Sequence, residues 1–147
     1  MGFRVTADAR TLAYLPDHEP SLGIDLTQIE PEWISGYQVA HGADVLFHDA
    51  QYSDHEYRTH VGWGHSSIDH AMIFARVMQV DQLVMFHHDP AHTDPQLESM
   101  RDLAKSHGGT SDPVLAAEGM EIHLGPAGVI IESPDTISLA QPVTLPE

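Results

Sequence analysis

Three polar clusters, each directly after a short apolar run, contain residue types that bind metal ions and exchange protons. They are Pro-Asp-His-Glu-Pro at residues 16–20, His-Asp-Ala-Gln-Tyr at 48–52 and His-His-Asp-Pro at 87–90. A fourth cluster, Gly-Trp-Gly-His-Ser-Ser at 62–67, stands before a helical pattern. Carboxylates and imidazoles that converge at strand ends and at a helix start can hold divalent ions and transfer protons. The four clusters together therefore indicate metal-assisted chemistry.

Each cluster also has a simpler explanation when it is taken alone. A strand-end Asp is often a turn residue, Gly-His-Ser before a helix can be only a cap, and His-His-Asp-Pro can be a plain loop. The chain has 12 histidines, and a histidine taken at random is usually a solvent-facing polar residue. The four clusters form one site only if their side chains lie close together in the folded protein; otherwise they are four unrelated loops.

Short apolar runs predict the strands that lead into the clusters. Residues 3–5 and 12–15 form a predicted hairpin, and the runs at 45–47 and 83–86 are typical of buried strands. The three strand-end clusters thus follow the carboxyl ends of predicted strands. Further strands are predicted at residues 114–117 and 120–124.

Helical patterns alternate with these strands. Apolar residues recur at helical spacing over residues 68–78, with Ser66 as the predicted cap and an end near Gln79. A second helix is predicted over 95–106, with proline in its first turn and two glycines after its end. Residues 21–42 predict a long loop with at most a short helix. This alternation is typical of a parallel or mixed α/β sheet, whose ligand sites lie beyond the carboxyl ends of the strands.

The composition restricts the class of protein and the kind of metal site. With 147 residues the chain is the size of one domain. No run approaches the ~20 apolar residues of a membrane span. The amino terminus lacks a signal-peptide pattern, so we expect a soluble, cytoplasmic protein. The chain has no cysteine, so imidazole and carboxylate groups would have to hold any metal ion.

The acidic charge balance restricts the substrate. The formal net charge is −16, with only six Lys and Arg residues, and binding of long nucleic acids depends on such basic side chains. Bound divalent cations would supply the positive charge that an anionic substrate needs. We therefore expect a small phosphodiester or similar ester as the substrate rather than tRNA.

Together and in this order, the four clusters resemble the metallo-β-lactamase-fold hydrolases, specifically the branch near the tRNA 3′-processing endonucleases and cyclic-nucleotide phosphodiesterases. The resemblance extends over about residues 2–124. Leu-Ala-Tyr-Leu-Pro-Asp at 12–17 is similar to the strand that ends in the metal-bridging aspartate of that branch. His-Asp-Ala-Gln-Tyr at 48–52 is similar to its His-Glu-Ala-Thr motif, with Asp in place of Glu. Its His-Ser-Thr motif and its later strand-end histidine are matched by His-Ser-Ser at 65–67 and Leu-Val-Met-Phe-His at 83–87.

The resemblance implies a role for each matching residue. Asp17 would bridge two metal ions, and His87 would bind one of them. His65 would protonate the leaving oxygen, and Asp49 would orient that imidazole. We prefer His87 to the adjacent His88 as the ligand because His87 comes first off the strand. A supporting or solvent-facing role is expected for His18, His88 and His92.

The sequence departs from the family in one major respect, and this departure indicates which part of the family's fold the chain corresponds to. The family's His-x-His-x-Asp-His motif is absent from the sequence. The resemblance therefore implies an α/β fold that forms the carboxy-terminal half of an αββα metallo-β-lactamase sandwich, a mixed sheet flanked by helices. We expect residues 1–125 to form this half, and residues 126–147, with four prolines, to form an extended arm or tail. Half a sandwich would expose an apolar sheet face, so we expect a homo-oligomer or a partner that carries the amino-terminal half.

These expectations describe a metal-dependent hydrolase that cleaves a phosphodiester and is incomplete without the His-rich half. Zinc is the expected cofactor, as two divalent ions in the complete site, and manganese and iron also suit such ligands. The alternative, from another functional class, is a non-catalytic half-fold remnant or interaction module, which explains the missing motif better. A histidine-rich metal buffer is disfavoured because it does not need histidines at strand ends in this order.

Overall fold

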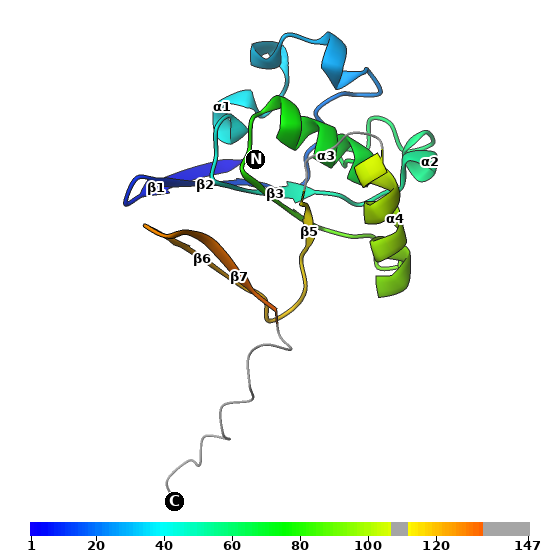
Figure 1. The fold of residues 1–147 in the computed structure, drawn as a ribbon. Helices are drawn as coiled ribbons and strands as arrows, with labels where there is room; N and C mark the ends of the chain where they lie inside the picture. Colours follow the sequence, from blue (N-terminus) through cyan, green and yellow to red (C-terminus); the bar gives the residue numbers. More distant parts are fainter. Residues whose placement is uncertain (107–111, 134–147) are drawn as a thin grey trace, which may run out of the picture.

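A mixed five-stranded sheet organises the residues that this computed structural model describes, 1–106 and 112–133. The spatial order of its strands is β1 (Phe3–Ala7), β2 (Arg10–Leu15), β3 (Val45–Asp49), β4 (Gln82–Phe86) and β5 (Val114–Leu115). β1 pairs antiparallel with β2, and all other neighbouring strands are parallel. Because β2, β3 and β4 run in one direction, their carboxyl ends meet at one edge of the sheet (Figure 1).

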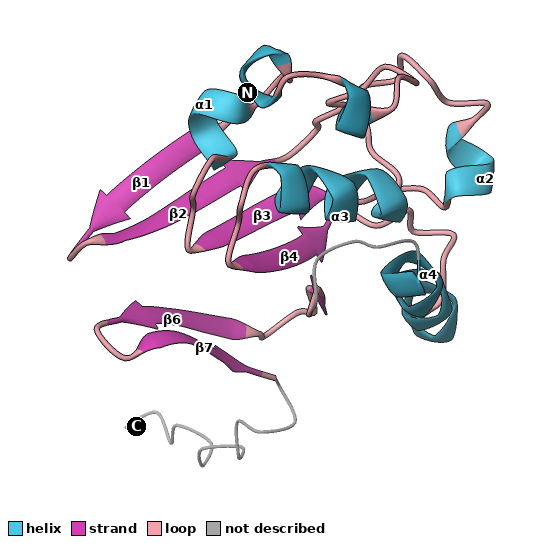
Figure 2. Ribbon diagram, turned by 45° about the horizontal axis from the view of Figure 1, so that its top comes forward, coloured by secondary structure: helices cyan, strands magenta, loops and turns pink. Residues whose placement is uncertain are grey.

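Helices accompany the crossovers between the parallel strands. α3 (Ile68–Val77) and α1 (Tyr37–Ala40) lie over one face of the sheet (Figures 1 and 2). No helix in the two described ranges is long and apolar enough to cross a membrane. The remaining helical elements are η1 (Leu26–Gln28), η2 (Pro31–Trp33), α2 (Asp54–Tyr57) and α4 (Asp94–Ser106).

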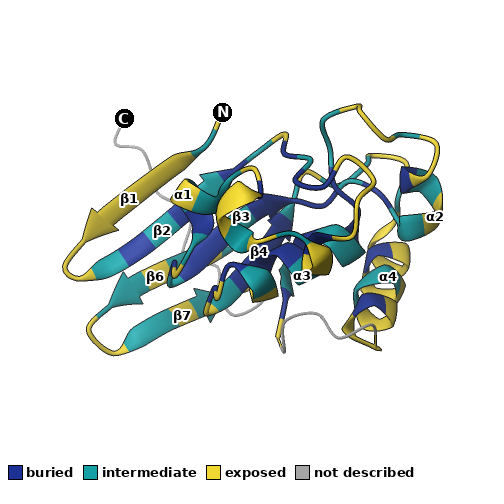
Figure 3. Ribbon diagram, turned by 90° about the horizontal axis from the view of Figure 1, so that it is seen from above, coloured by how far each residue is buried: buried dark blue, intermediate teal, exposed yellow. Residues whose placement is uncertain are grey.

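The hydrophobic core lies between this sheet face and the helices. Alternate residues of β2, β3 and β4 point into it, as the two-residue period of a strand requires. β3 and β4 are largely buried, whereas β1 is exposed along its whole length (Figure 3). Burying each large apolar side chain contributes roughly 1.5–3 kcal/mol, so this core fixes the three strand ends relative to α3. Its fully buried members include Leu46, Ile68, Met72, Phe74, Leu83 and Met85.

The opposite face of the sheet carries aromatic side chains and a separate hairpin. The hairpin consists of β6 (Glu121–Gly125) and β7 (Gly128–Glu132) and lies on this side of the sheet (Figures 1 and 2). Arg10 ties its turn to the sheet, because the Arg10 guanidinium donates to the Gly125 carbonyl at 3.1 Å. The hairpin is thus a partial second layer. Ring centroids lie 5.2–6.5 Å apart between neighbours in the set Phe3, Tyr14, Phe47 and Phe86.

The structure confirms the predicted strands and both predicted helices, with small differences in their bounds. The predicted cap of α3 is wrong by one residue: the hydroxyl of Ser67, not that of Ser66, accepts from the His70 N–H. α2 was not predicted. β7 pairs part of the expected arm with β6, while residues 134–147 lie outside the described residues, so the division at residue 125 stays a prediction.

Candidate metal centre

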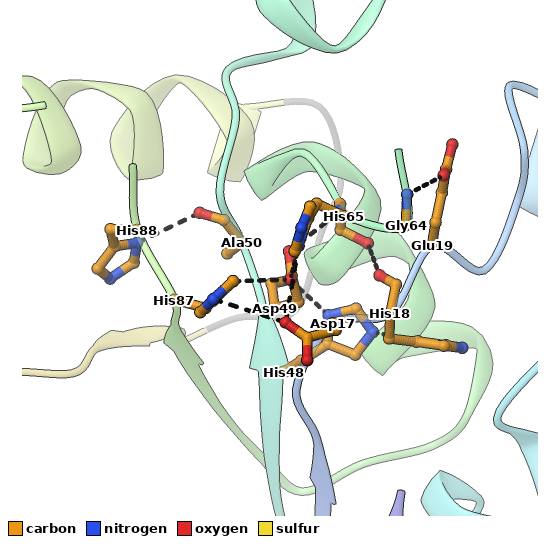
Figure 4. A network of polar contacts seen from close by, with 11 residues as sticks. Asp17, His18, Glu19, His48, Asp49, Ala50, Gly64, His65, His87 and His88 are labelled. Atoms are coloured by element: carbon orange, nitrogen blue, oxygen red, sulfur yellow. Dashed lines mark hydrogen bonds and ion pairs between the residues drawn. The ribbon is translucent and has the colours of Figure 1, made fainter. Parts of the chain in front are cut away.

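Three strand ends and one helix start place four side chains together at the carboxyl edge of the sheet (Figure 4). Asp17 follows β2, Asp49 ends β3, His87 follows β4, and His65 precedes α3. One ligand atom from each of the four lies within 4.8 Å of the others. Within the described part of the chain, no other set of three or more His, Asp and Glu side chains converges in this way. The structure thus brings together all four residues predicted from the sequence, and their chemical roles stay predictions.

Asp17 and His87 have the separation expected of two ligands on one ion. Asp17 Oδ1 lies 3.6 Å from His87 Nε2, which is too long for a hydrogen bond. Two donors bound tetrahedrally to one zinc ion at ~2.1 Å lie about 3.4 Å apart. Both side chains are accessible, with exposed fractions of 64% for Asp17 and 40% for His87. The donor set therefore fits a divalent cation that enters from solvent.

Asp49 is the fully buried carboxylate that orients both imidazoles. Its Oδ2 accepts hydrogen bonds from His65 Nδ1 at 2.7 Å and from His87 Nδ1 at 3.1 Å. Its Oδ1 accepts from the backbone N–H of Ser66 at 2.8 Å. These charge-assisted bonds compensate for the hydration that the buried carboxylate loses. Since Nδ1 is the donor in both rings, each Nε2 is left to bind a metal ion or exchange a proton.

The backbone is strained at the two accessible members of the group. Asp17 has φ +41° and His87 has φ +60°, which lies in the left-handed region that residues other than glycine rarely adopt. This conformation costs roughly 1–2 kcal/mol at an ordinary residue. Such outliers cluster at functional sites, where the surrounding structure maintains them. Two of the six non-glycine residues with positive φ in the described ranges thus belong to this group, and the other four lie in turns away from it.

A buried pair of imidazoles adjoins the group. His18 Nδ1 lies 2.8 Å from His48 Nε2, and His48 Nδ1 lies 2.6 Å from the Asp49 carbonyl oxygen. A carbonyl can only accept, so the His48 proton is on Nδ1, and His48 Nε2 accepts from the Nδ1–H of His18. Burial lowers the pKa of His18 to about 4 and the pKa of His48 to about 3. Both rings are therefore neutral at pH 7 and support the Asp17 and Asp49 segments without adding charge.

Two further histidines after β4 lie outside the group. His88 Nδ1 donates to the Ala50 carbonyl at 3.2 Å, and burial lowers the pKa of His88. His92 Nε2 pairs with Glu56 Oε1 at 3.0 Å. This placement is consistent with the preference for His87 over His88 as the metal ligand.

Sequence reasoning did not assign two residues that support the site. The Ser66 hydroxyl donates to the His18 carbonyl at 2.7 Å, while its N–H binds Asp49. Glu19 accepts hydrogen bonds from the backbone N–H groups of Gly62 and Gly64. Both supporting residues stand in the polar clusters at 16–20 and 62–67, and the two closely spaced glycines indicate an unusual backbone conformation. The carboxylate that they face is too distant in sequence to be inferred from that pattern.

Comparisons with known proteins support a shared fold. No protein-family model and no curated relative matches the chain. Among solved structures, the chain is similar to the crystal structure of the metallo-β-lactamase fold protein YhfI from Bacillus subtilis, with a TM-score of 0.57 and 17% sequence identity. The match covers 89% of this chain and 43% of the YhfI chain, so this chain spans less than half of that protein's length. The mixed sheet with its flanking helices therefore has the metallo-β-lactamase fold over that part.

Proposed function

We propose that this chain forms the carboxy-terminal half of a metal-dependent hydrolase of the metallo-β-lactamase fold, one that cleaves a phosphodiester. The observation that carries the proposal is the convergence of Asp17, Asp49, His65 and His87 at the carboxyl edge of the sheet. A resemblance to the branch near tRNA 3′-processing endonucleases and cyclic-nucleotide phosphodiesterases motivates the choice of reaction. The net charge of −16 favours a small phosphodiester or similar ester over a long nucleic acid.

Asp17 and His87 are the proposed metal-holding residues. Their facing donor atoms, 3.6 Å apart, suit one ion, and Asp17 keeps a second carboxylate oxygen for another ion. Zinc suits imidazole with carboxylate, and manganese and iron also accept these ligands. A bound divalent ion would lower the pKa of a coordinated water and neutralise charge on phosphoryl oxygens. The Nδ1–H bond from His87 to Asp49 holds the ring with Nε2 toward Asp17.

His65 is the proposed general acid. Its Nδ1–H is committed to Asp49 Oδ2 at 2.7 Å, so Nε2 is the atom that would deliver a proton to the leaving oxygen. The bond to the buried Asp49 carboxylate fixes the orientation of the His65 ring. The side chain of His65 is 21% exposed, which leaves the ring accessible to a substrate while its orientation is fixed.

The proposed site needs ligands from outside this half. Hydrolytic zinc sites typically use three protein ligands, whereas Asp17 and His87 supply two. We propose that a second polypeptide carrying the His-rich half of the fold, or a second copy of the chain, supplies the rest. The exposed apolar side chains of β1, Phe3 at 54% and Val5 at 56%, support such an association.

A non-catalytic interaction module is the second candidate. It is favoured by the small ligand set, because a half-fold that binds a partner needs no complete metal shell. The two candidates differ in one requirement: only the hydrolase needs His65 Nε2 to remain accessible and protonated during turnover.

Metal analysis of the purified chain, combined with a bis(4-nitrophenyl) phosphate assay, tests the proposal. The assay is run with the chain alone and with an added polypeptide that carries a His-x-His-x-Asp-His motif on a metallo-β-lactamase amino-terminal half. We expect metal content that falls in Asp17→Asn and His87→Ala, and turnover that appears or rises when the added half is present. Metal binding without turnover under every condition would favour the interaction module, and no metal uptake would overturn the proposed site.

A further inference from the structure

Glu19 joins its own segment to α2 and to the loop before His65; Figure 4 shows its contact with Gly64. Its Oε1 accepts hydrogen bonds from the Tyr57 hydroxyl at 2.7 Å and from the Gly62 N–H at 2.8 Å. Its Oε2 accepts from the Gly64 N–H at 2.8 Å. Gly64 directly precedes His65, and Glu19 lies two residues after Asp17. One carboxylate therefore connects the segment that holds the proposed metal ligand to the segment that holds the proposed general acid.

The loop that carries His65 turns two glycine N–H groups toward Glu19. Gly62 has φ +86° and Gly64 has φ +90°, and in this left-handed conformation both N–H groups point at the same carboxylate. Trp63 between them is exposed, at 65%, so the apolar core does not hold the loop in place. Trp63 contacts His60 through its ring, at 4.7 Å between centroids, and through a backbone bond of 3.1 Å. These contacts are local. Glu19 ties residues 62–64 to the Asp17 segment, and the Ser66 hydroxyl on the His18 carbonyl is a second tie, on the other side of His65.

The groups that contact Glu19 require a carboxylate at this position rather than an amide. All three partners of Glu19 donate, and a carboxylate offers only acceptor oxygens, whereas a glutamine would turn an NH₂ group toward at least one donor. Hydrogen bonds from these donors to a carboxylate are charge-assisted and therefore stronger than bonds to a neutral amide oxygen.

We propose that Glu19 is a positioning residue that sets the His65 imidazole against Asp17 and Asp49. This inference rests on the proposed function for its consequence in catalysis, while its structural part stands alone. His65 Nδ1 lies 2.7 Å from Asp49 and 4.0 Å from Asp17. Both distances depend on the backbone conformation of residues 62–65. Glu19, from the Asp17 segment, binds this backbone at Gly62 and Gly64.

Glu19→Gln in the metal-free full chain tests the structural part by NMR. We expect amide hydrogen exchange at Gly62 and Gly64 to rise roughly tenfold, the equivalent of one lost hydrogen bond of ordinary strength. We also expect the ring nitrogen resonances of His65 to shift. Tyr57→Phe, which removes one of the three donors, should give a smaller change in the same direction and serves if Glu19→Gln does not fold. Glu56→Gln is the matched control, because the Glu56 carboxylate also accepts several hydrogen bonds, in the capping box of α2 and from His92, but makes none with residues 62–65.

The outcomes separate this inference from the proposed function. Unchanged glycine exchange in Glu19→Gln overturns the inference, and so does faster exchange with unshifted His65 ring signals, because the role would then be structural only. Where turnover is measurable, we expect Glu19→Gln to lower kcat about tenfold with KM within about twofold, since orientation and not binding is lost. Equal kcat in Glu19→Gln and Glu56→Gln would also overturn it. Absence of turnover in the native chain even with the added amino-terminal half would count against the hydrolase, and the NMR measurements would then decide the role of Glu19.

Discussion

Acidification should destabilise the metal-free protein through the buried imidazoles of His18 and His48. The pKa of His18 is lowered to about 4 and that of His48 to about 3, from an ordinary value of 6.5. Below pH 6.5 the unfolded chain therefore binds protons at both residues while the folded chain does not. Since the unfolded state then holds more protons, the free energy of unfolding decreases as the pH falls. The contribution of the neutral pair is fully present above pH 6.5 and is lost as the pH falls toward 3 to 4.

The size of the effect follows from these pKa values. At pH 5, which is 1.5 units below the ordinary value, each histidine removes about 2 kcal/mol at about 1.36 kcal/mol per unit. The pair thus removes about 4 kcal/mol, a large share of the ~5–15 kcal/mol that stabilises a typical domain. Near pH 5.5 the free energy of unfolding should change by about 2.4 kcal/mol per pH unit. Burial also lowers the pKa of His70 and of His88, which adds to the effect in the same direction.

Urea unfolding in EDTA at pH 7.5, 6.0 and 5.0, followed by far-UV circular dichroism, measures this dependence. His18→Asn removes one titrating ring and should reduce the slope by about 1 kcal/mol per pH unit. Leu83→Ala is the control, because it empties core space without removing a titratable group. It should lower the free energy of unfolding by about 2–5 kcal/mol at every pH and keep the native slope. Two results would show that the buried pair does not set the pH dependence. One is a free energy of unfolding that stays constant from pH 7.5 to 5.0, and the other is a His18→Asn variant whose free energy of unfolding changes with pH as steeply as that of the native protein.

Three further predictions concern the site and its support. Asp49→Asn should weaken Zn²⁺ binding about 10- to 100-fold, because an amide brings N–H groups toward imidazole donors. Competition with a zinc-binding dye measures this, and unchanged affinity would contradict the orienting role. His65→Ala should reduce turnover on substrates with poor leaving groups far more than on activated aryl esters, and equal losses in steady-state assays would remove the acid role. Gly36→Ala should destabilise by about 2–3 kcal/mol, because its Cβ would lie 2.8 Å from His18 Cε1 at φ +83°. Gly42→Ala, at φ +62° with open space around it, should cost only about 1 kcal/mol in thermal unfolding, and equal costs would disprove the steric contribution.

The position of the site could be predicted because it depends mainly on strand direction. Apolar runs identified β2, β3 and β4, and the helix predicted between β3 and β4 indicated a parallel crossover, whereas only a long loop with at most a short helix was predicted between β2 and β3. Residues that directly follow parallel strands must then share one edge of the sheet. Strand direction thus placed Asp49 and His87 together, and the family resemblance added Asp17 and His65.

Details that depend on competition between side chains could not be predicted. Ser66 and Ser67 are equally suited to cap α3 in the sequence, and only the presence of Asp49 in three dimensions assigns Ser66 to the carboxylate. The bond between Glu19 and Gly62 joins residues 43 positions apart, which no local pattern indicates. Likewise, β7 forms from a short apolar run among prolines and glycines, where its pairing with β6 decides its conformation.

The left-handed backbone at Asp17 and His87 restricts which amino acids can occupy these positions at all. Glycine, asparagine and aspartate enter this region with the least strain, whereas valine, isoleucine and threonine clash with their own main chain. A redesign of metal selectivity must therefore begin with side chains that are not branched at Cβ, because this backbone conformation accepts them. Homologous chains should show the same restriction. Residues branched at Cβ should be rare at positions 17 and 87, whatever their ability to bind a metal ion.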